Sequence, residues 1–297
     1  YNEKKIAIII SGNVMVRNYL STNTFHNLNK KFDILYLVDG SNVGSFKYFI
    51  KKKLNFHKFF YSKKDLQKYN NFHLLNTYSS EKKSKSIRYS VQRILRHKLF
   101  YPDQFLKNVL LLPLRFISKL KKNFIYLLYK NIYSRYGNIK IGNKIISKLE
   151  NLILKFKPDL IVCPTAGQSI SYYDSVRIGK KIGIKSLAII DNWDNMSSRT
   201  HPKPHADHYA VWGKQSKSHG QHIQCINKKN ISIVGSARFQ KYFKLRDKNL
   251  KNNFKFKYAL LFEGFGIEED LEVIMDKLEK IIHTHKIKNF KIIYRPH

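Results

Sequence analysis

The chain has 297 residues, and its 43% hydrophobic and 14% aromatic content is enough for one large or two medium-sized folded domains, which excludes a disordered chain. Its 56 lysines and arginines against 20 aspartates and glutamates give a formal net charge of +36. A charge this high indicates a polyanionic partner such as nucleic acid, an anionic membrane or a phosphorylated substrate, or else it reflects coding DNA rich in A and T.

The cysteines and the chain ends give further expectations. Cys163 and Cys225 are too few for a disulfide framework, so we expect a reducing, cytoplasmic setting. The sequence has neither a signal peptide nor an apolar run of about eighteen residues that would span a membrane. The chain starts without methionine shortly before a first strand and stops directly after a strand. We therefore expect a fragment whose second domain is truncated.

The first predicted elements alternate between strands and helices. The run KKIAIIISGN predicts a buried strand that ends in a glycine turn, residues 16–28 predict a helix, and FDILYLVDG predicts a second strand. A third strand is expected at 56–61. A strand–helix–strand unit is typical of a parallel α/β sheet.

A long basic and aromatic segment then interrupts the alternation. From Ser84 to about Arg135 the pattern is helical, with Pro102 and Pro113 breaking or starting helices, and 140–156 predict another amphipathic helix. These helices either pack on the sheet with solvated lysines or lie on an anionic bilayer. We expect packing for the fold, with peripheral membrane contact as an added role.

The alternation returns after this insertion. Strands are expected at PDLIVCPTAG, KSLAIID, HYAVWG and NISIVGSARF, with helices over 169–183 and 214–224. A lysine-rich linker over about 241–255 leads to a second unit, in which FKYALLFEGFG and FKIIYRPH flank the helix IEEDLEVIMDKLEKIIHTHK. The prediction is an α/β protein with two Rossmann-like domains in tandem. The first covers 1–240 with an insertion at about 84–156, and the second, truncated, covers 256–297.

Ligands of open α/β sheets bind beyond the carboxyl ends of the strands, so the residues that follow each strand are candidates. Ser11, Gly12 and Asn13 follow the first strand and precede a helix, where backbone amides can hold an anion. A plain capped turn explains these residues equally well. The turn TAGQS at 165–169 is interpreted as helix capping.

The densest polar cluster is DNWDN, directly after the strand KSLAIID. Asp191 and Asp194 are candidates for a general base. Asn192 adds a polar group, Trp193 can stack on a sugar or a base, and Arg199 can hold a phosphate or carboxylate. The alternative is an Asx-turn network with Trp193 in the core. We favour a functional loop because one capping residue would suffice for a turn.

Other signatures of chemistry are weak. His201, His205 and His208 are imaginable metal ligands, but no cysteine or acidic pair completes a tetrahedral set, so we expect no metal site. The sequence contains no G-x-G-x-x-G fingerprint, Walker A loop, G-x-S-x-G elbow, HExxH or CxxC motif.

Taken in order, DNWDNMSSR, VWGKQSKSHG, VGSARF and YRPH resemble bacterial two-domain glycosyltransferases of the GT-B architecture that build cell-surface polysaccharides. They are more distantly similar to CDP-glycerol glycerophosphotransferases and to non-hydrolysing UDP-N-acetylglucosamine 2-epimerases. The resemblance covers about 155–297. It implies a nucleotide-activated donor bound mainly by the second domain, an acceptor bound mainly by the first, and an active site in the cleft between them.

The same resemblance assigns the donor site. Arg295 and His297 would contact the donor phosphates, and Glu263, Gly264 and Gly266 would form a glycine-rich loop facing the diphosphate. The carboxylate that binds the donor ribose in such enzymes lies further downstream, so we expect this fragment to lack full donor binding and activity. Cations and amide dipoles can neutralise the departing diphosphate, so no obligatory metal or other cofactor is expected.

The sequence therefore predicts a glycosyltransferase that moves a sugar, or a sugar-like phosphate unit, from a nucleotide-sugar donor to a saccharide or lipid-linked acceptor. We expect it in the cytoplasm, peripherally bound to the anionic inner face of the membrane. One alternative is a nucleotide-sugar epimerase of the same fold. Another is a basic nucleic-acid-binding protein, but no helix-turn-helix, RRM or zinc-finger signature is present, so we expect no specific nucleic-acid partner.

Overall fold

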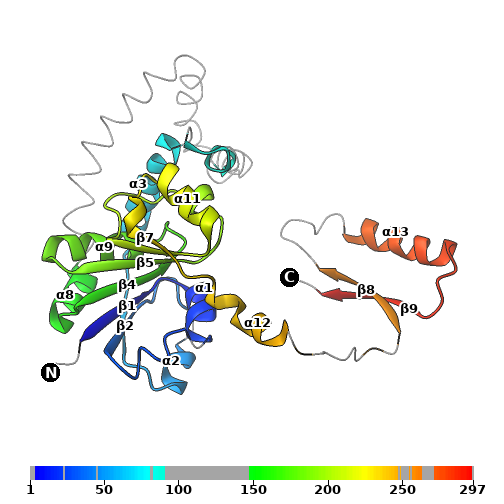
Figure 1. The fold of residues 1–297 in the computed structure, drawn as a ribbon, viewed down its shortest axis with the longest axis horizontal. Coiled ribbons are helices and arrows are strands. Elements are labelled where there is room, and N and C mark those ends of the chain that lie inside the picture. The colour runs from blue at the N-terminus through cyan, green and yellow to red at the C-terminus, as the bar shows by residue number, and fades with distance from the viewer. Residues whose placement is uncertain are drawn as a thin grey trace, which may run out of the picture. The chain divides into compact units, whose positions relative to one another are not determined.

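The computed structural model describes residues 4–22, 24–44, 46–80, 83–90, 147–246, 248, 254, 256–262 and 271–295. The chain divides into two compact units, Tyr1–Gln240 and Lys241–His297, called here the first unit and the second unit. A seven-stranded sheet forms the centre of the first unit, and a two-stranded sheet that of the second (Figure 1).

The sheet of the first unit is parallel throughout, and its strand order is β3-β2-β1-β4-β5-β6-β7. The strands are β1 (Lys5–Ile10), β2 (Asp33–Asp39), β3 (Phe56–Phe59), β4 (Leu160–Thr165), β5 (Lys185–Ile190), β6 (His208–Val211) and β7 (Ile231–Ile233). This is the doubly wound Rossmann order, in which the strand order reverses between β1 and β4. The predicted Rossmann-like fold of this unit is confirmed.

Helices bury both faces of the central strands, which explains why these strands are continuous apolar runs. In β1, Ile6, Ile8 and Ile10 belong to the core on one face, while Ala7 and Ile9 belong to the core on the other. The first of these cores includes side chains of α1 (Asn13–Met15), η1 (Val16–Leu20) and α2 (Lys47–Lys51).

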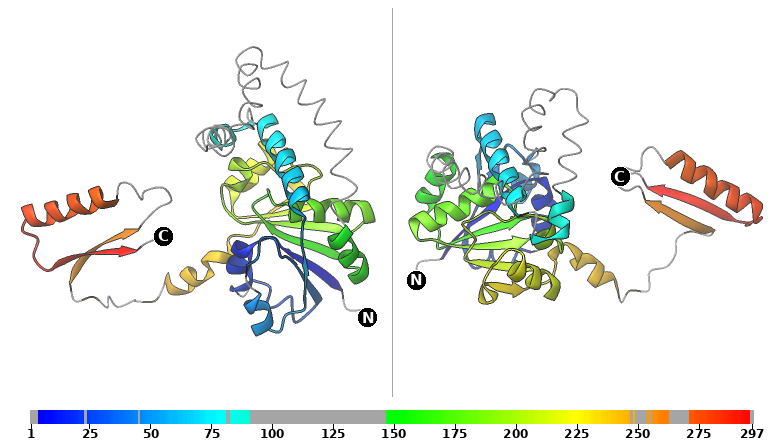
Figure 2. Two further views of the ribbon diagram at one scale, coloured as in Figure 1. Left: turned by 180° about the vertical axis from the view of Figure 1, so that it is seen from behind. Right: turned by 90° about the horizontal axis from the view of Figure 1, so that it is seen from above.

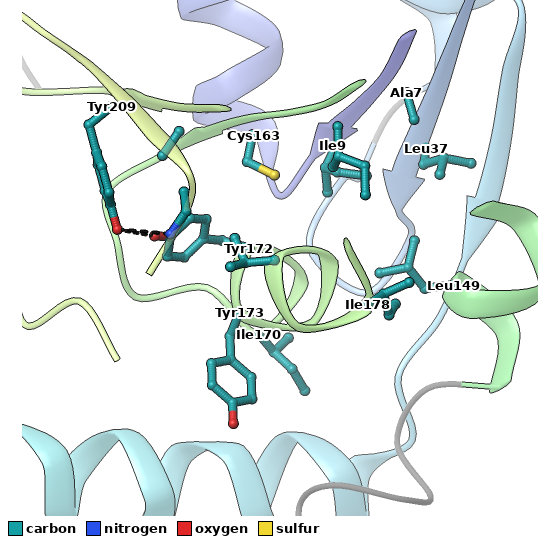
Figure 3. Close-up of a cluster of buried hydrophobic side chains, with 14 of the residues drawn as sticks. Ala7, Ile9, Leu37, Leu149, Cys163, Ile170, Tyr172, Tyr173, Ile178 and Tyr209 are labelled. Atoms are coloured by element: carbon teal, nitrogen blue, oxygen red, sulfur yellow. Dashed lines mark hydrogen bonds between the residues drawn. The ribbon is translucent and has the colours of Figure 1, made fainter. Parts of the chain in front are cut away.

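The second core is built with α3 (Lys63–Ser79), α8 (Ser147–Phe156) and α9 (Ile170–Ile182). Its aromatic part holds Tyr172 and Tyr209, whose hydroxyl oxygens lie 3.0 Å apart in a hydrogen bond (Figure 3). The bond satisfies two hydroxyls that would otherwise be costly to bury. The chain also forms α10 (Asn195–Ser198), α11 (Lys214–His222), η4 (Lys228–Asn230) and η5 (Ala237–Phe239).

The turn between β4 and α9 shows why a helix begins there. Gly167 has a φ of 90°, a conformation that favours glycine, and its amide donates a 2.8 Å hydrogen bond to Thr165 Oγ1. Ser169 Oγ accepts from the amide of Tyr172 at 3.2 Å, and Gly183 ends α9 at a φ of 79°. The predicted capping turn is confirmed.

Three predicted elements differ from the structure. The helix expected over 16–28 ends at Leu20, after the π-helix η1, because the hydroxyls of Ser21 and Thr22 bond to the carbonyls of Arg17 and Asn18 and compete with the helical pattern. The strand expected over 56–61 ends at Phe59. The segment expected to be a linker begins with the helix α12 (Gln240–Arg246). Of the predicted basic insertion, residues 91–146 lie outside the described residues, and α8 falls within the helix predicted at 140–156.

The second unit is one strand–helix–strand motif. Strands β8 (Lys257–Phe262) and β9 (Phe290–Arg295) pair in parallel, and α13 (Leu271–Thr284) connects them (Figure 2). The parallel α/β start of a second unit was predicted and is confirmed. None of the described helices combines the length and the apolar content needed to cross a bilayer.

Candidate functional site

Three chain segments meet at the carboxyl ends of β1, β4 and β5. Asp191 is the first residue after β5, and its amide donates to the carbonyl of Thr165, the last residue of β4, at 2.9 Å. From the segment after β1, Asn18 Nδ2 donates to Asp191 Oδ1 at 2.8 Å. Asp191 is only 8% exposed. The carboxylate therefore lies beside the β1–β4 reversal, where sheets of this order bind ligands.

The π-helix η1 presents Tyr19 beside Asn18. Burial raises the pKa of the Tyr19 hydroxyl above its ordinary value, the adjacent Asp191 carboxylate raises it further, and Arg238 acts in the opposite direction. Asn18, Tyr19, Asp191 and Arg238 thus form one electrostatically connected group, called here the Asp191 cluster. π-helical turns are frequent at functional sites.

Arg238 lies in η5, which follows β7 and packs against η1. Its guanidinium carbon is 4.8 Å from the centre of the Phe239 ring and 5.4 Å from that of Trp212. Trp212 Nε1 donates to the carbonyl of Ile190 at 3.0 Å, which fixes the indole next to the residue that precedes Asp191. Two aromatic rings therefore hold the cation near the carboxylate.

The DNWDN loop combines a turn network with an exposed aromatic. Asn192 donates its amide to Asn195 Oδ1 at 2.8 Å and accepts from the amide of Trp193 at 3.1 Å. Asp194 Oδ2 accepts from Ser198 Oγ at 2.8 Å. These contacts are those of an Asx-turn network, but the Trp193 side chain is 52% exposed and lies outside the core. Of the two aspartates, Asp191 contacts Asn18 of η1, whereas Asp194 accepts a hydrogen bond from Ser198 within the short helix α10.

The residues predicted after β1 contact the segment after β2. Asn13 Oδ1 accepts from the amide of Gly44 at 3.1 Å, so this side chain ties the turn to the segment after β2. Gly12 and Ser11 are half-buried, and a side chain at position 12 would touch Asn42. α1 has three residues and no side-chain cap. This turn supports the start of η1.

Arg199 lies toward α3. Its carbonyl accepts from Gln224 Nε2 at 2.8 Å. Burial, and then the nearby charge of Arg199, lower the pKa of His73 in α3 to about 4. The structure therefore brings Arg199 to the face opposite η1, and the predicted contact with a substrate anion stays a prediction.

The donor-site residues fall in the second unit. Arg295 is the last residue of β9 and is exposed. The other predicted donor contacts, Glu263, Gly264, Gly266 and His297, lie outside the described residues. Their roles stay predictions from the resemblance.

Sequence reasoning missed two members of the Asp191 cluster and gave the third, Arg238, no specific role. Asn18 and Tyr19 belong to a segment predicted as an ordinary helix, and nothing in its pattern says which side chains reach the strand ends. Arg238 is part of the motif VGSARF, so its position after a strand was a usable signal.

A second buried polar group lies under α9. The Asp174 carboxylate is fully buried, and Arg177 Nε lies 3.9 Å from its Oδ1. Burial raises the pKa of Asp174 to about 7, while Arg177 and Tyr61 act to lower it. In the same layer the His201 ring packs over Gly167 and between Tyr172 and Tyr209, and burial lowers the pKa of His201 to about 3.

The described residues offer no candidate metal site. Among residues 4–22, 24–44, 46–80, 83–90 and the later described ranges, no three histidine, cysteine, aspartate or glutamate side chains are grouped as metal ligands. His201 is instead a core residue, packed against aromatic rings.

Comparison with known proteins gives similarity to solved structures only. No family model matches the chain, and no curated protein matches it. A putative UDP-N-acetylglucosamine 2-epimerase from Listeria monocytogenes is similar at 8% identity and a TM-score of 0.49, over 99% of this chain and 62% of that one. A glycosyltransferase from Rickettsia africae ESF-5 is similar at 10% identity and a TM-score of 0.42, over 99% and 69%.

The third similar structure is Arabidopsis thaliana UGT89C1 complexed with quercetin, at 9% identity and a TM-score of 0.43, over 99% of this chain and 70% of that one. The chain thus spans 62% of the length of the Listeria protein.

Proposed function

We propose that the first unit is the acceptor-binding domain of a glycosyltransferase of the GT-B type, with Asp191 as its general base. The observation that carries the proposal is the Asp191 carboxylate. It is nearly buried at the carboxyl edge of the sheet and accepts a hydrogen bond from a separate segment, through Asn18. A carboxylate held in this way is positioned to take a proton from a bound hydroxyl. The ordered motifs from DNWDNMSSR to YRPH support the same reaction class.

In the proposed reaction, Asp191 removes the proton of an acceptor hydroxyl as its oxygen attacks the anomeric carbon of the donor sugar. The bond between that carbon and the donor diphosphate breaks, and the nucleoside diphosphate leaves with the bonding electrons. Asn18 donates to Asp191 Oδ1, and the adjacent Tyr19 hydroxyl also interacts with this carboxylate. Asn18 and Tyr19 fix the orientation of the carboxylate before the acceptor binds.

Trp193 is proposed to hold the acceptor sugar. Its exposed ring offers an apolar face, and its carbonyl is tied to α11 by a 2.9 Å hydrogen bond from Ser216 Oγ. This bond ties down the backbone of Trp193, two residues after Asp191, and sugar rings stack on such aromatic faces. Under the resemblance, Arg295, His297, Glu263, Gly264 and Gly266 would bind the donor.

The test is acceptor-dependent release of nucleoside diphosphate by the full-length protein, assayed with a panel of nucleotide sugars. Release that requires a saccharide or lipid-linked acceptor supports the transferase. Interconversion of nucleotide sugars without any acceptor would instead establish the epimerase alternative. Activity that persists after chelation of divalent ions would agree with the metal-independent mechanism proposed here.

We also propose peripheral association with an anionic membrane, on the strength of the +36 net charge. Basic surfaces bind anionic lipid through interactions that salt screens. Sedimentation with phosphatidylglycerol-containing vesicles, but not with neutral phosphatidylcholine vesicles, is the expected result. Equal binding to both would argue against electrostatic docking.

A further inference from the structure

Arg238 is a cation that no described carboxylate pairs with directly. Within the described ranges its guanidinium makes neither a hydrogen bond nor an ion pair, and its contacts are with the Trp212 and Phe239 rings. Asp191 and Arg238 both act on the Tyr19 hydroxyl. The hydrogen bond that Asp191 accepts comes from Asn18, not from Arg238. Aromatic contacts thus position the Arg238 guanidinium, and its N–H groups remain available to a ligand.

The way in which Arg238 is held points to the kind of ligand. The Trp212 and Phe239 rings, inclined at 81° to each other, contact the Arg238 guanidinium without offering a conventional hydrogen-bond acceptor, so its N–H groups stay available. That edge is a planar fork of donors, which matches the two oxygens of a carboxylate or the oxygens of a phosphate. Trp212 and Phe239 therefore supply the aromatic contacts of Arg238, and an oxyanion would supply the hydrogen-bond acceptors that it lacks.

We propose that Arg238 binds an oxyanion of the acceptor, so that the acceptor is an anionic saccharide bearing a carboxylate or a phosphate. The inference rests on the proposed function and specifies its substrate class. A donor diphosphate has the same chemistry, but Arg238 belongs to the first unit and to the cluster of the proposed base, whereas the predicted donor contacts belong to the second unit. A neutral sugar would need no cation beside Asp191. An anionic sugar does need one, because the negative charge of the Asp191 carboxylate would otherwise repel the negative charge of the sugar.

The test uses D-glucuronate and D-glucose as a matched pair, since they differ in the carboxylate at carbon 6. Binding of each to the full-length protein is measured by ligand-observed NMR titration, for the wild type and for Arg238→Gln. Lys155→Gln is the control, because it removes one positive charge from the exposed face of α8. Circular dichroism and Tm establish that each variant is folded.

We expect wild-type protein to bind glucuronate about tenfold more tightly than glucose, as one charge-assisted hydrogen-bond pair implies. Arg238→Gln should remove this preference, Arg238→Lys should restore part of it, and Lys155→Gln should keep it. Equal binding of the two sugars, no binding of either, or a preference that survives Arg238→Gln would each overturn the inference.

A UDP arm separates the two sources of an oxyanion. Loss of UDP affinity in Arg238→Gln with unchanged glucuronate affinity would move Arg238 to the donor and overturn the inference. The proposed function fails separately, through absence of acceptor-dependent nucleoside diphosphate release. A glucuronate preference that depends on Arg238 can stand without that release, so the two failures are distinguishable.

Discussion

The two buried carboxylates Asp191 and Asp174 of the first unit have very different surroundings. Asp191 lies at the strand ends with Asn18, Tyr19 and Arg238 around it, and the exposed Trp193 follows two residues later. Asp174 lies within α9, fully buried next to Tyr61, and Arg177 Nε lies 3.9 Å from its Oδ1.

Burial of an acid therefore does not by itself identify a functional site. Asp174 has the clearer pKa perturbation, raised to about 7, yet it is sealed under a helix where no substrate can reach it. Asp191 accepts a hydrogen bond from a separate segment and keeps a small exposed fraction, 8%, at the strand ends. Strained or desolvated structural groups and functional groups both perturb pKa values, so access and partners must decide.

The largest expected effect tests the open side of the comparison. Asp191→Asn keeps the shape of the side chain but cannot accept a proton, so turnover of the full-length protein should fall by about 10²–10⁴-fold. Acceptor-dependent release of nucleoside diphosphate is the measurement. Asp33→Asn, at the start of β2, is the matched control and should retain activity. A wild-type rate in Asp191→Asn would remove Asp191 from the chemistry.

The sealed side should respond to pH instead of to substrate. The pKa of Asp174 is about 7 in the folded state against an ordinary 3.8, so the folded state binds the proton more tightly and loses stability as pH rises from about 4 to about 7. Asp174→Asn removes this loss. The unfolding free energy of the wild type relative to the variant should therefore fall across that interval, by on the order of 3 kcal/mol.

Urea denaturation of both proteins at several pH values measures this difference. His73 and His201, whose folded pKa values are lowered, act in the opposite direction but are common to both proteins and cancel. A difference that does not change with pH would show that Asp174 is ionised at little cost.

Gly167 tests how tightly the sealed side is packed. A Cβ at this position would lie 2.3 Å from the His201 ring, and the φ of 90° is unfavourable for alanine. We expect Gly167→Ala to lower the unfolding free energy by about 3 kcal/mol. Gly183→Ala has a similar φ of 79° but open space around it, so it should cost only about 1 kcal/mol. Equal losses would mean that His201 moves aside freely.

The two tryptophans give the smallest effects and sharpen the contrast. Trp212→Phe removes the donor to the carbonyl of Ile190 and should cost about 1–2 kcal/mol of stability. Trp193→Phe should change stability by less than about 0.5 kcal/mol, because the side chain is exposed. Trp193→Ala should raise the KM for acceptor about fivefold. Thermal unfolding and acceptor kinetics check these values.

Much of the fold could be predicted because strand sequences carry their own signal. β1, β2, β4 and β5 are apolar runs bounded by polar turns, and both of their faces are buried as such runs require. The caps of α9 followed from Ser169 and Gly183. The early end of the first helix did not, because local hydroxyl-to-carbonyl bonds decided it.

The site was only half predictable for a different reason. Asp191 was found from its place after a strand, but its partner Asn18 is 173 positions away in the sequence. No local pattern links them, since the contact exists only after β1 and β5 are placed in one sheet. Arg238 could be listed as a strand-end residue, but its neighbourhood with Tyr19 required the folded chain.

The π-helix η1 has a consequence for how this arrangement could be lost. A π-helical turn holds one residue more than an α-helical turn, and each residue of an α-helix turns the chain by about 100°. Deletion of either Val16 or Arg17 would let the segment form a regular α-helix. Asn18 and Tyr19 would then be rotated away from Asp191. The extra residue of the π-helical turn thus sets the direction of the Asn18 side chain, and the hydrogen bond from Asn18, after β1, to Asp191, after β5, depends on it.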